Sequence, residues 1–243
     1  MPTPTYDSIA DWYTAKMQEG GAGAWAFPTL LELIGEVEGQ QICDLGCGEG
    51  RFARLLAQRG ATVVGIDRSA LLIKAAQRQE AHQPLGIHYG VEDAQSLVSI
   101  PDQTFDGVVC CLALMDIPDL DATLRTVQRV LKPDGWFVFL ITHPCFASPN
   151  ASARTADDGS VVWEIRRYFV EGFFQSERSG SLLAQVGAHH RTLATYLNAL
   201  AAAGLRITHA IEPQRTDSVS TPNPGHSVVP LLLLMRCISM PLP

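Results

Sequence analysis

Short apolar runs alternate with segments of helical periodicity between residues 41 and 142 of this 243-residue chain. This alternation is typical of βαβ units and a parallel sheet. The near-continuous apolar run over 105–114 is typical of a central parallel strand that helices cover on both faces. The pattern predicts strands over 41–45, 61–66, 87–91, 105–114 and 136–141.

Turn and capping residues predict where the intervening helices begin and end. One helix should run over about 51–59 and stop at Gly60, which suits the left-handed position after a helix. A second should follow Ser69, whose side chain can cap it. A third carries apolar residues at helical spacing over 120–131 and should end by Pro133.

The pattern changes after residue 144. Residues 145–190 show little periodicity, yet they hold six of the 18 aromatic side chains. A loop of this length without structure is unusual in a compact domain, so we expect a lid with a short hairpin around 161–174. The aromatic stretch could instead pack as core or form a dimer contact. A last helix over about 193–204, capped by Thr192, and two strands over 205–211 and 228–238 should complete the fold.

Charge and composition narrow the classes of partner. The chain has 18 Lys and Arg against 25 Asp and Glu, a net charge of −7 that would repel a phosphate backbone, so no nucleic-acid partner is expected. The first residues lack the basic and apolar regions of a secretory signal, and the most apolar run, 228–235, is too short to span a bilayer. We therefore expect a cytoplasmic protein with no membrane partner and six free cysteines.

A glycine-rich turn over 46–50 follows the first predicted strand and opens a helix. Such turns bind nucleotides, because glycines let the backbone approach the ligand and the helix offers free N–H groups. Asp67 ends the second strand, where it can accept both hydroxyls of a ribose. Asp44 and Glu49 bracket the turn with negative charge, which would repel a pyrophosphate and favours a cationic ligand such as S-adenosylmethionine.

The run over 43–50 (CDLGCGEG) resembles the first motif of the class I S-adenosylmethionine-dependent methyltransferases. Four further motifs that resemble the family's follow in the same order, over 65–69, 90–94, 111–118 and 129–135. The last has Asp134 where glycine is common, a mild departure because aspartate also suits turns. The similarity covers residues 6–142 well and the remainder more loosely, and it is nearest to the small-molecule, methyltransferase type 11 or UbiE-like branch.

The resemblance implies the architecture of that family. We expect an α/β, Rossmann-like, doubly wound sheet of seven strands, mostly parallel with an antiparallel last strand. One methyltransferase domain, 1–243, would then consist of an N-terminal helical cap (1–38), a cofactor-binding core (39–144), a lid or substrate insertion (145–190), and a C-terminal helix with the last two strands (191–243).

The family's roles also imply which positions hold S-adenosylmethionine, with S-adenosylhomocysteine as product and no metal. Asp44 and the glycine turn would face the methionine end, Asp67 the ribose, and Asp93 with Ala94 the adenine. Arg68 could stack on the adenine. The full set of implied cofactor residues is Tyr13, Asp44, Gly46, Cys47, Gly48, Asp67, Arg68, Asp93, Ala94 and Leu112.

Methyl transfer from a sulfonium needs an aligned acceptor, and it needs a base only if the acceptor arrives protonated. His143 follows the fifth strand and His190 precedes the last helix, so both are candidate bases or orienting groups, with a structural hydrogen bond or cap as the alternative. The other histidines, including His189, are expected to be at the surface or satisfied. Candidate acceptor-binding residues, which could hold a carboxylate or phosphate, are Arg166, Tyr168, Arg191 and Tyr196.

The leading functional hypothesis is methyl transfer to an oxygen, nitrogen or carbon atom of a small organic molecule. Two alternatives share the cofactor: a tRNA or other nucleic-acid methyltransferase, and a protein that binds S-adenosylmethionine without catalysis. A nicotinamide oxidoreductase is the other reading of the turn with Asp67. The run over 115–118 does not resemble the Asn-Pro-Pro-Tyr-like run of enzymes that methylate bases. A monomer and a homodimer are both compatible with the sequence.

Overall fold

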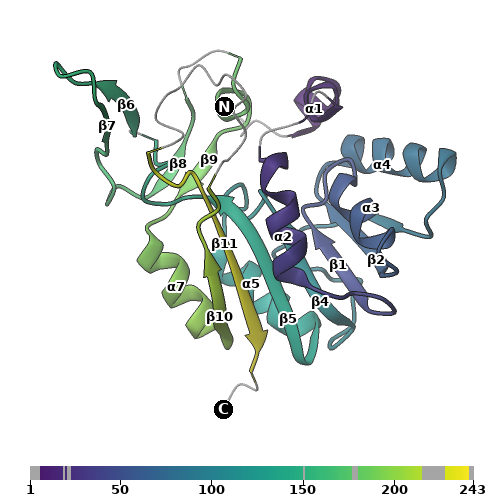
Figure 1. Cartoon of the computed structure of the whole chain (residues 1–243). Helices are drawn as coiled ribbons and strands as arrows, with labels where there is room; N and C mark the ends of the chain where they lie inside the picture. Colours follow the sequence, from purple (N-terminus) through teal and green to yellow (C-terminus); the bar gives the residue numbers. More distant parts are fainter. Residues whose placement is uncertain are drawn as a thin grey trace.

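A seven-stranded sheet forms the centre of the protein, as predicted (Figure 1). The computed structural model describes residues 6–18, 20, 23–149, 151–176, 180–214 and 228–240. The strand order is β10-β11-β5-β4-β1-β2-β3, and β11 alone runs antiparallel to the other six strands. The strands are β1 (Gln41–Leu45), β2 (Thr62–Asp67), β3 (His88–Val91), β4 (Phe105–Cys111), β5 (Leu131–Thr142), β10 (Leu205–Ile211) and β11 (Leu232–Ser239).

Helices cover both faces of this sheet, so the doubly wound arrangement is confirmed. On one face lie α2 (Phe27–Ile34) and α3 (Arg51–Ala57), and on the other α5 (Leu120–Val130) and α7 (Leu193–Ala202). The helix α4 (Ala70–His82) packs against β2 and β3. The predicted caps are present, since the hydroxyls of Ser69 and Thr192 accept hydrogen bonds from Leu72 N and Thr195 N.

Three strand boundaries differ from the predictions by three or more residues, among them the start of the last strand, which lies at Leu232 rather than 228. The fifth strand begins at Leu131 rather than 136, because the chain is already extended at the end of α5 and Leu131 pairs with Phe105. The fourth ends at Cys111 rather than 114, because Leu112 adopts a left-handed backbone with φ 55° and the chain turns there.

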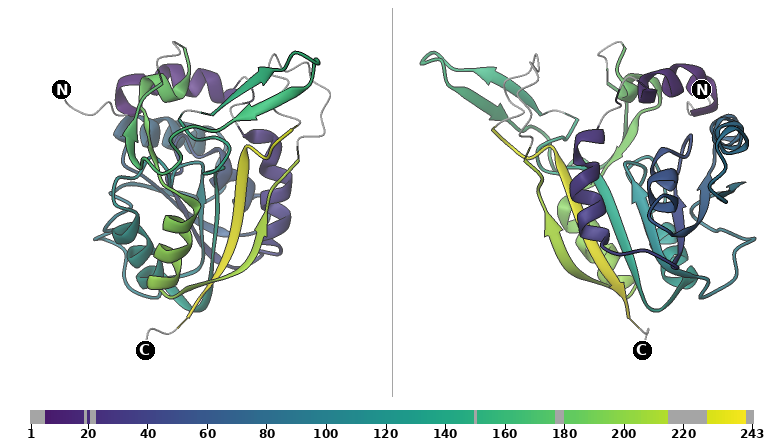
Figure 2. Two further views of the ribbon diagram at one scale, coloured as in Figure 1. Left: turned by 90° about the vertical axis from the view of Figure 1, so that its left-hand side faces the viewer. Right: turned by 45° about the vertical axis from the view of Figure 1, so that its right-hand side comes forward.

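The segment after β5 contains two small sheets, so the prediction of one hairpin around 161–174 is wrong. Strands β6 (Ser152–Thr155) and β7 (Val161–Glu164) form a hairpin around Gly159, which projects from the body in both views of Figure 2. Strand β8 (Gly172–Phe174) pairs instead with β9 (Ala188–His190), and α6 (Leu182–Gln185) lies between them in sequence. Asp158-Gly159 was the missed hairpin signal.

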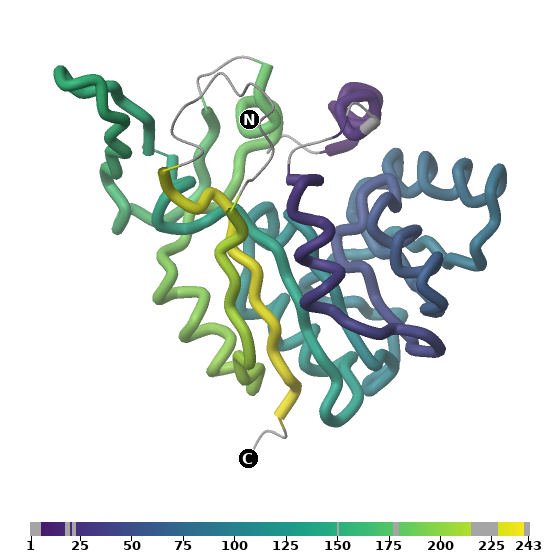
Figure 3. Tube along the Cα trace, in the orientation of Figure 1, coloured from purple at the N-terminus to yellow at the C-terminus, as the bar shows by residue number. Residues whose placement is uncertain are grey.

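The N-terminal segment lies across the same end of the sheet as β8 and β9 (Figure 3). It consists of the 3-10 turn η1 (Tyr6–Ile9) and α1 (Ala10–Gln18), with η2 (Ala24–Ala26) before α2. Asp7 holds η1 against the start of α4, since its Oδ1 accepts hydrogen bonds from Ser69 Oγ at 2.5 Å and Leu71 N at 3.1 Å. No helix in the described ranges is long and apolar enough to cross a bilayer.

Strand β1 places one carboxylate inside the sheet. Asp44 shares the face of Ile42, which packs with α2 and α3, and its side chain is completely buried. Burial raises the pKa of Asp44 to about 7; the Ala53 N–H offsets part of the rise, although neither carboxylate oxygen makes a hydrogen bond of normal geometry with the described residues. Folding therefore favours the protonated form of Asp44 relative to the unfolded chain, and this form predominates in the folded protein below about pH 7.

We expect Asp44→Asn to flatten the pH dependence of stability. Because the pKa is raised by folding, the contribution of Asp44 is fully present below its unfolded pKa and is lost as the pH rises through about 7. Between pH 5 and pH 8 the free energy of unfolding of the native protein should fall relative to that of the variant by about 2–3 kcal/mol. Urea unfolding at several pH values measures this, and parallel curves for the two proteins would contradict it.

Candidate active site

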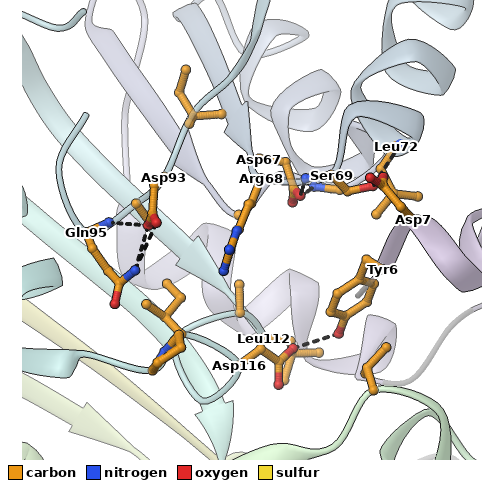
Figure 4. Close-up of a pocket in the computed structure, with 18 of the residues that line it drawn as sticks. Tyr6, Asp7, Asp67, Arg68, Ser69, Leu72, Asp93, Gln95, Leu112 and Asp116 are labelled. Atoms are coloured by element: carbon orange, nitrogen blue, oxygen red, sulfur yellow. Dashed lines mark hydrogen bonds between the residues drawn. The ribbon is translucent and has the colours of Figure 1, made fainter. Parts of the chain in front are cut away.

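A cavity of about 470 Å³ opens at the carboxyl-terminal ends of β1, β2 and β4. Open α/β sheets place their ligands at this edge. The cavity has three walls: the glycine turn with the ends of the strands, the N-terminal cap, and the insertion that contains β8 and β9. Five acidic side chains and one arginine line it: Asp7, Asp67, Glu92, Asp93, Asp116 and Arg68. All of these except Glu92 are labelled in Figure 4.

The glycine turn is tightly packed against its surroundings. Gly46 has φ 75°, and a Cβ atom there would lie 2.4 Å from the Cβ of Ala113 in the loop after β4. Gly46 N and Cys47 N donate to the carbonyl of Ile66 at 2.7 and 3.0 Å, which fixes the turn on β2. A side chain at position 46 would push the two loops apart, so only glycine fits both the backbone angle and the space.

Asp67 connects the turn to the start of α4. Its Oδ2 accepts a hydrogen bond from Gly48 N at 2.9 Å, and its Oδ1 accepts one from Ser69 N at 2.8 Å. Burial raises the pKa of Asp67, and the hydrogen bonds that it accepts from backbone N–H groups partly offset that rise. Each carboxylate oxygen has a further lone pair, so Asp67 can still accept hydrogen bonds from a ligand in the cavity.

Polar side chains continue along the cavity beyond β3. Asp93 Oδ1 accepts hydrogen bonds from Gln95 N and from Gln95 Nε2, both at 2.9 Å, which fixes its carboxylate. Arg68 extends between Asp93 on one side and Tyr6 on the other (Figure 4). This end of the cavity therefore combines hydrogen-bond acceptors in fixed positions with one long cationic side chain.

The N-terminal cap supplies two tyrosines. Tyr13 lies over Gly48, and its ring meets that of Tyr6 edge-on with centroids 5.3 Å apart. The hydroxyl of Tyr6 donates to Asp116 Oδ2 at 2.6 Å, across 110 positions of sequence. Burial, chiefly, raises the pKa of Asp116 to about 7.

The insertion supplies the third wall through β8 and β9. His189 N donates to the carbonyl of Met115 at 2.8 Å, so β9 is fixed to the loop after β4. The His189 ring packs against Phe173 with centroids 5.3 Å apart. Burial lowers the pKa of His189, so the neutral imidazole is the favoured form.

Eight of the ten residues that the sequence indicated for cofactor binding line this cavity. They are Tyr13, Gly46, Gly48, Asp67, Arg68, Asp93, Ala94 and Leu112. Asp44, in β1, is instead buried, and so is Cys47, within the turn. Neither is among the lining residues, so any effect on a ligand would act through the turn.

His143 and His190, the two predicted bases, both lie outside the cavity lining. His143 is buried, its Nδ1 accepts from Cys145 N at 3.1 Å, and its Nε2 lies 2.9 Å from Glu212 Oε1. His190 is buried with its Nε2 2.7 Å from the carbonyl of Tyr168. The structural alternative fits these contacts, and it is the neighbouring His189 that lines the cavity, because side chains alternate along β9.

The four predicted acceptor-binding residues also lie outside the cavity lining. Arg166 is exposed and pairs with Glu164 at 2.6 Å. Arg191 is buried, where its guanidinium donates to the carbonyls of Leu114, Ile117 and Pro118 at 2.6–3.3 Å. The Tyr168 hydroxyl accepts from Leu193 N at 2.8 Å, and Tyr196 is buried in the core. These groups build the insertion and the loop after β4.

Sequence reasoning missed several lining residues, notably Tyr6, Asp7, Asp116, Phe173 and His189. For Tyr6 and Asp116 the signal was present but incomplete, since each lies in a segment that resembles the family. The alternation of strand residues would have separated His189 from His190 only if the strand over 188–190 had been recognised.

The comparisons with known proteins agree with this geometry. Residues 43–139 match the family model described as a methyltransferase domain. A crystal structure of an S-adenosylmethionine-dependent methyltransferase from Mesorhizobium loti is 36% identical, with a TM-score of 0.76 over 89% of this chain and 98% of that chain.

Curated enzymes match over a shorter region. The ubiquinone biosynthesis O-methyltransferase of Chromobacterium violaceum is 33% identical over 115 residues, which cover 46% of this chain and 50% of that enzyme. The enzyme of the same name from Pseudomonas fluorescens is 34% identical over 101 residues, or 42% of this chain and 44% of that enzyme. The chain thus matches half or less of the length of these enzymes. Together, the Mesorhizobium structure and the matching fold show that this chain belongs to the class I S-adenosylmethionine-dependent methyltransferases.

Proposed function

We propose that this methyltransferase binds S-adenosylmethionine in the cavity and transfers its methyl group to a small organic molecule. The observation that carries the proposal is the charge of the cavity, where five acidic side chains and one arginine surround a glycine turn. A dinucleotide pyrophosphate would be repelled by this set, whereas a sulfonium cation gains from it.

The residues present fit the cofactor. Gly46 has no side chain, so the turn packs directly against Ala113. Gly46 and Gly48 of this turn both line the cavity, where their backbone can meet a ligand. The free lone pairs of Asp67 suit ribose hydroxyls, and Asp93 and Ala94 lie farther along the same edge, where we place the adenine. When bound, S-adenosylmethionine supplies an activated methyl group on a leaving group that departs as a neutral thioether.

The chain's own contribution is then to position the acceptor and exclude water. We place the acceptor at the end of the cavity bounded by the cap and the insertion, where Tyr6, Asp116, Phe173 and His189 are found. In-line displacement gains most from alignment of the reacting atoms. The main requirement is therefore that the walls at this end of the cavity hold the methyl acceptor in a fixed position. The names of the curated relatives support oxygen as the acceptor atom.

Asp67→Asn should weaken binding of S-adenosylhomocysteine by about 10- to 100-fold, because hydrogen bonds to a charged group contribute about 1.5–3 kcal/mol. Isothermal titration calorimetry at pH 7.5 measures this, and thermal unfolding without ligand reports any damage to the turn. Asp121→Asn, an exposed position on α5, is the matched control and should bind as the native protein does. Equal affinities for all three proteins would contradict the placement of the ribose.

Incubation with S-adenosylmethionine and a panel of small alcohols, phenols, amines and acids should release S-adenosylhomocysteine with at least one acceptor. Bulk tRNA serves as the competing substrate, and its methylation in preference to every small molecule would favour the nucleic-acid alternative. Tight binding of the cofactor without release in any reaction would favour a protein that binds it without catalysis.

A further inference from the structure

We propose that Asp116 is the group that takes the proton of the acceptor, and that this end of the cavity selects an uncharged molecule that reacts through a hydroxyl oxygen. The inference rests on the proposed function and deepens it. Nothing in the predicted set of catalytic residues included Asp116, and both histidines in that set lie outside the cavity lining.

The loop after β4 presents Asp116 to the cavity. Leu112 and Ala113 precede it and Ile117 and Pro118 follow it, and all four line the same cavity. Asp116 Oδ2 accepts a hydrogen bond from the hydroxyl of Tyr6 at 2.6 Å. Oδ1 accepts no hydrogen bond from the described residues, and it is not completely buried. One oxygen is thus oriented by the cap while the other is accessible to an acceptor.

The position of the loop is fixed from behind. The buried guanidinium of Arg191 donates to three carbonyls on either side of Asp116, those of Leu114, Ile117 and Pro118. A group on a loop held in this way can keep one orientation toward a reacting atom. Arg191 and Tyr6 are therefore positioning residues, and Asp116 is the group that meets the acceptor.

The charged and titratable groups around Asp116 suit a base at neutral pH. The pKa of Asp116 is raised to about 7, chiefly by burial and also by the charge of Asp67 at the end of β2, although the Tyr6 hydroxyl and Arg191 offset part of the rise. A base whose pKa lies near the working pH is efficient, because it is ionised often enough to accept a proton and basic enough to hold it. His189 also lines the cavity, but its own pKa is lowered and its ring packs on Phe173.

The charge and the walls of this end restrict the acceptor. An anionic acceptor would face Asp116 and Asp67, and Arg68 is the one lysine or arginine among the described residues that line the cavity. An ammonium group would lie close to the sulfonium cation and be repelled by it. Apolar side chains, among them Ile117, Phe173 and Val186, provide contact for an uncharged body.

The proton and electron balance of the step is simple. The O–H bond of the acceptor breaks and its proton passes to Asp116 Oδ1, while an electron pair on the acceptor's own oxygen forms the new bond to the methyl carbon. The pair of the broken carbon–sulfur bond stays on sulfur. Asp116 becomes a neutral carboxylic acid, which its buried site favours, and it later returns the proton to solvent.

The first test compares Asp116→Asn with Asp119→Asn, an equivalent change three positions along at the N-cap of α5, where asparagine caps equally well. Turnover is measured on a matched pair, 3,4-dihydroxybenzyl alcohol and 3,4-dihydroxybenzoate, within the wider panel. The native protein and Asp119→Asn should prefer the uncharged member, and Asp116→Asn should lose about 10²- to 10⁴-fold in turnover while binding S-adenosylhomocysteine within a few-fold of native.

The outcomes separate the two proposals. Full turnover by Asp116→Asn, or preference for carboxylate or amine acceptors, would overturn the inference and leave the proposed function standing. Failure of the native protein to bind S-adenosylhomocysteine would overturn both.

A second test needs no turnover. Calorimetry on protein saturated with S-adenosylhomocysteine measures the affinity for 3,4-dihydroxybenzyl alcohol between pH 5.5 and pH 8. Affinity for the native protein should fall as the pH drops through about 7, because protonated Asp116 accepts the hydroxyl poorly. In Tyr6→Phe the fall should occur at higher pH, since a contact that lowers the pKa is lost, and in Asp116→Asn it should vanish. Identical pH profiles, or no binding of the alcohol to the native protein, would overturn the inference.

Discussion

The carboxylate of Asp67 is the contact on which the arrangement of the site depends. It accepts hydrogen bonds from N–H groups of the glycine turn and of the start of α4. One side chain at the end of β2 therefore fixes these two segments relative to each other. The carbonyl of Ile66, one residue earlier, accepts two further N–H groups of the same turn. Gly46, which has no side chain, packs directly against the loop after β4, and the cavity lies beside this contact.

The other two walls reach the cavity through contacts between distant parts of the chain. Asp7 and Tyr6 attach the cap at two points, one on α4 and one on Asp116. The insertion is attached by His189 and Arg191, whose donors all reach carbonyls of the loop over 114–118. That short loop therefore receives contacts from both the first and the last third of the chain. The carboxylate of Asp116 lies on this loop, between the two sets of contacts.

Local signals explain what could be predicted from the sequence. The succession of strands and helices, the helix caps and the acidic end of β2 follow from short motifs and periodicity, and those features are present. The seven-stranded sheet with its antiparallel strand is implied by the resemblance to the family. The acceptor end could not be predicted in the same way, because Tyr6 and Asp116 are 110 positions apart and their contact exists only in the folded chain. Arg191 shows the limit of arguing from residue type: an arginine expected to bind an anion is used, once buried, to satisfy backbone carbonyls. His189 and His190 differ by one strand position, and that difference decides which faces the cavity.

The central claim is that a sulfonium nucleoside binds at the acidic edge of β1 and β2, with the cap over it. A crystal structure of the protein with S-adenosylhomocysteine tests this most directly. The account predicts ribose hydroxyls within hydrogen-bonding distance of Asp67 and a sulfur atom on the side of the cavity that leads to Asp116. A nucleoside bound elsewhere, or one whose ribose makes no contact with Asp67, would contradict it.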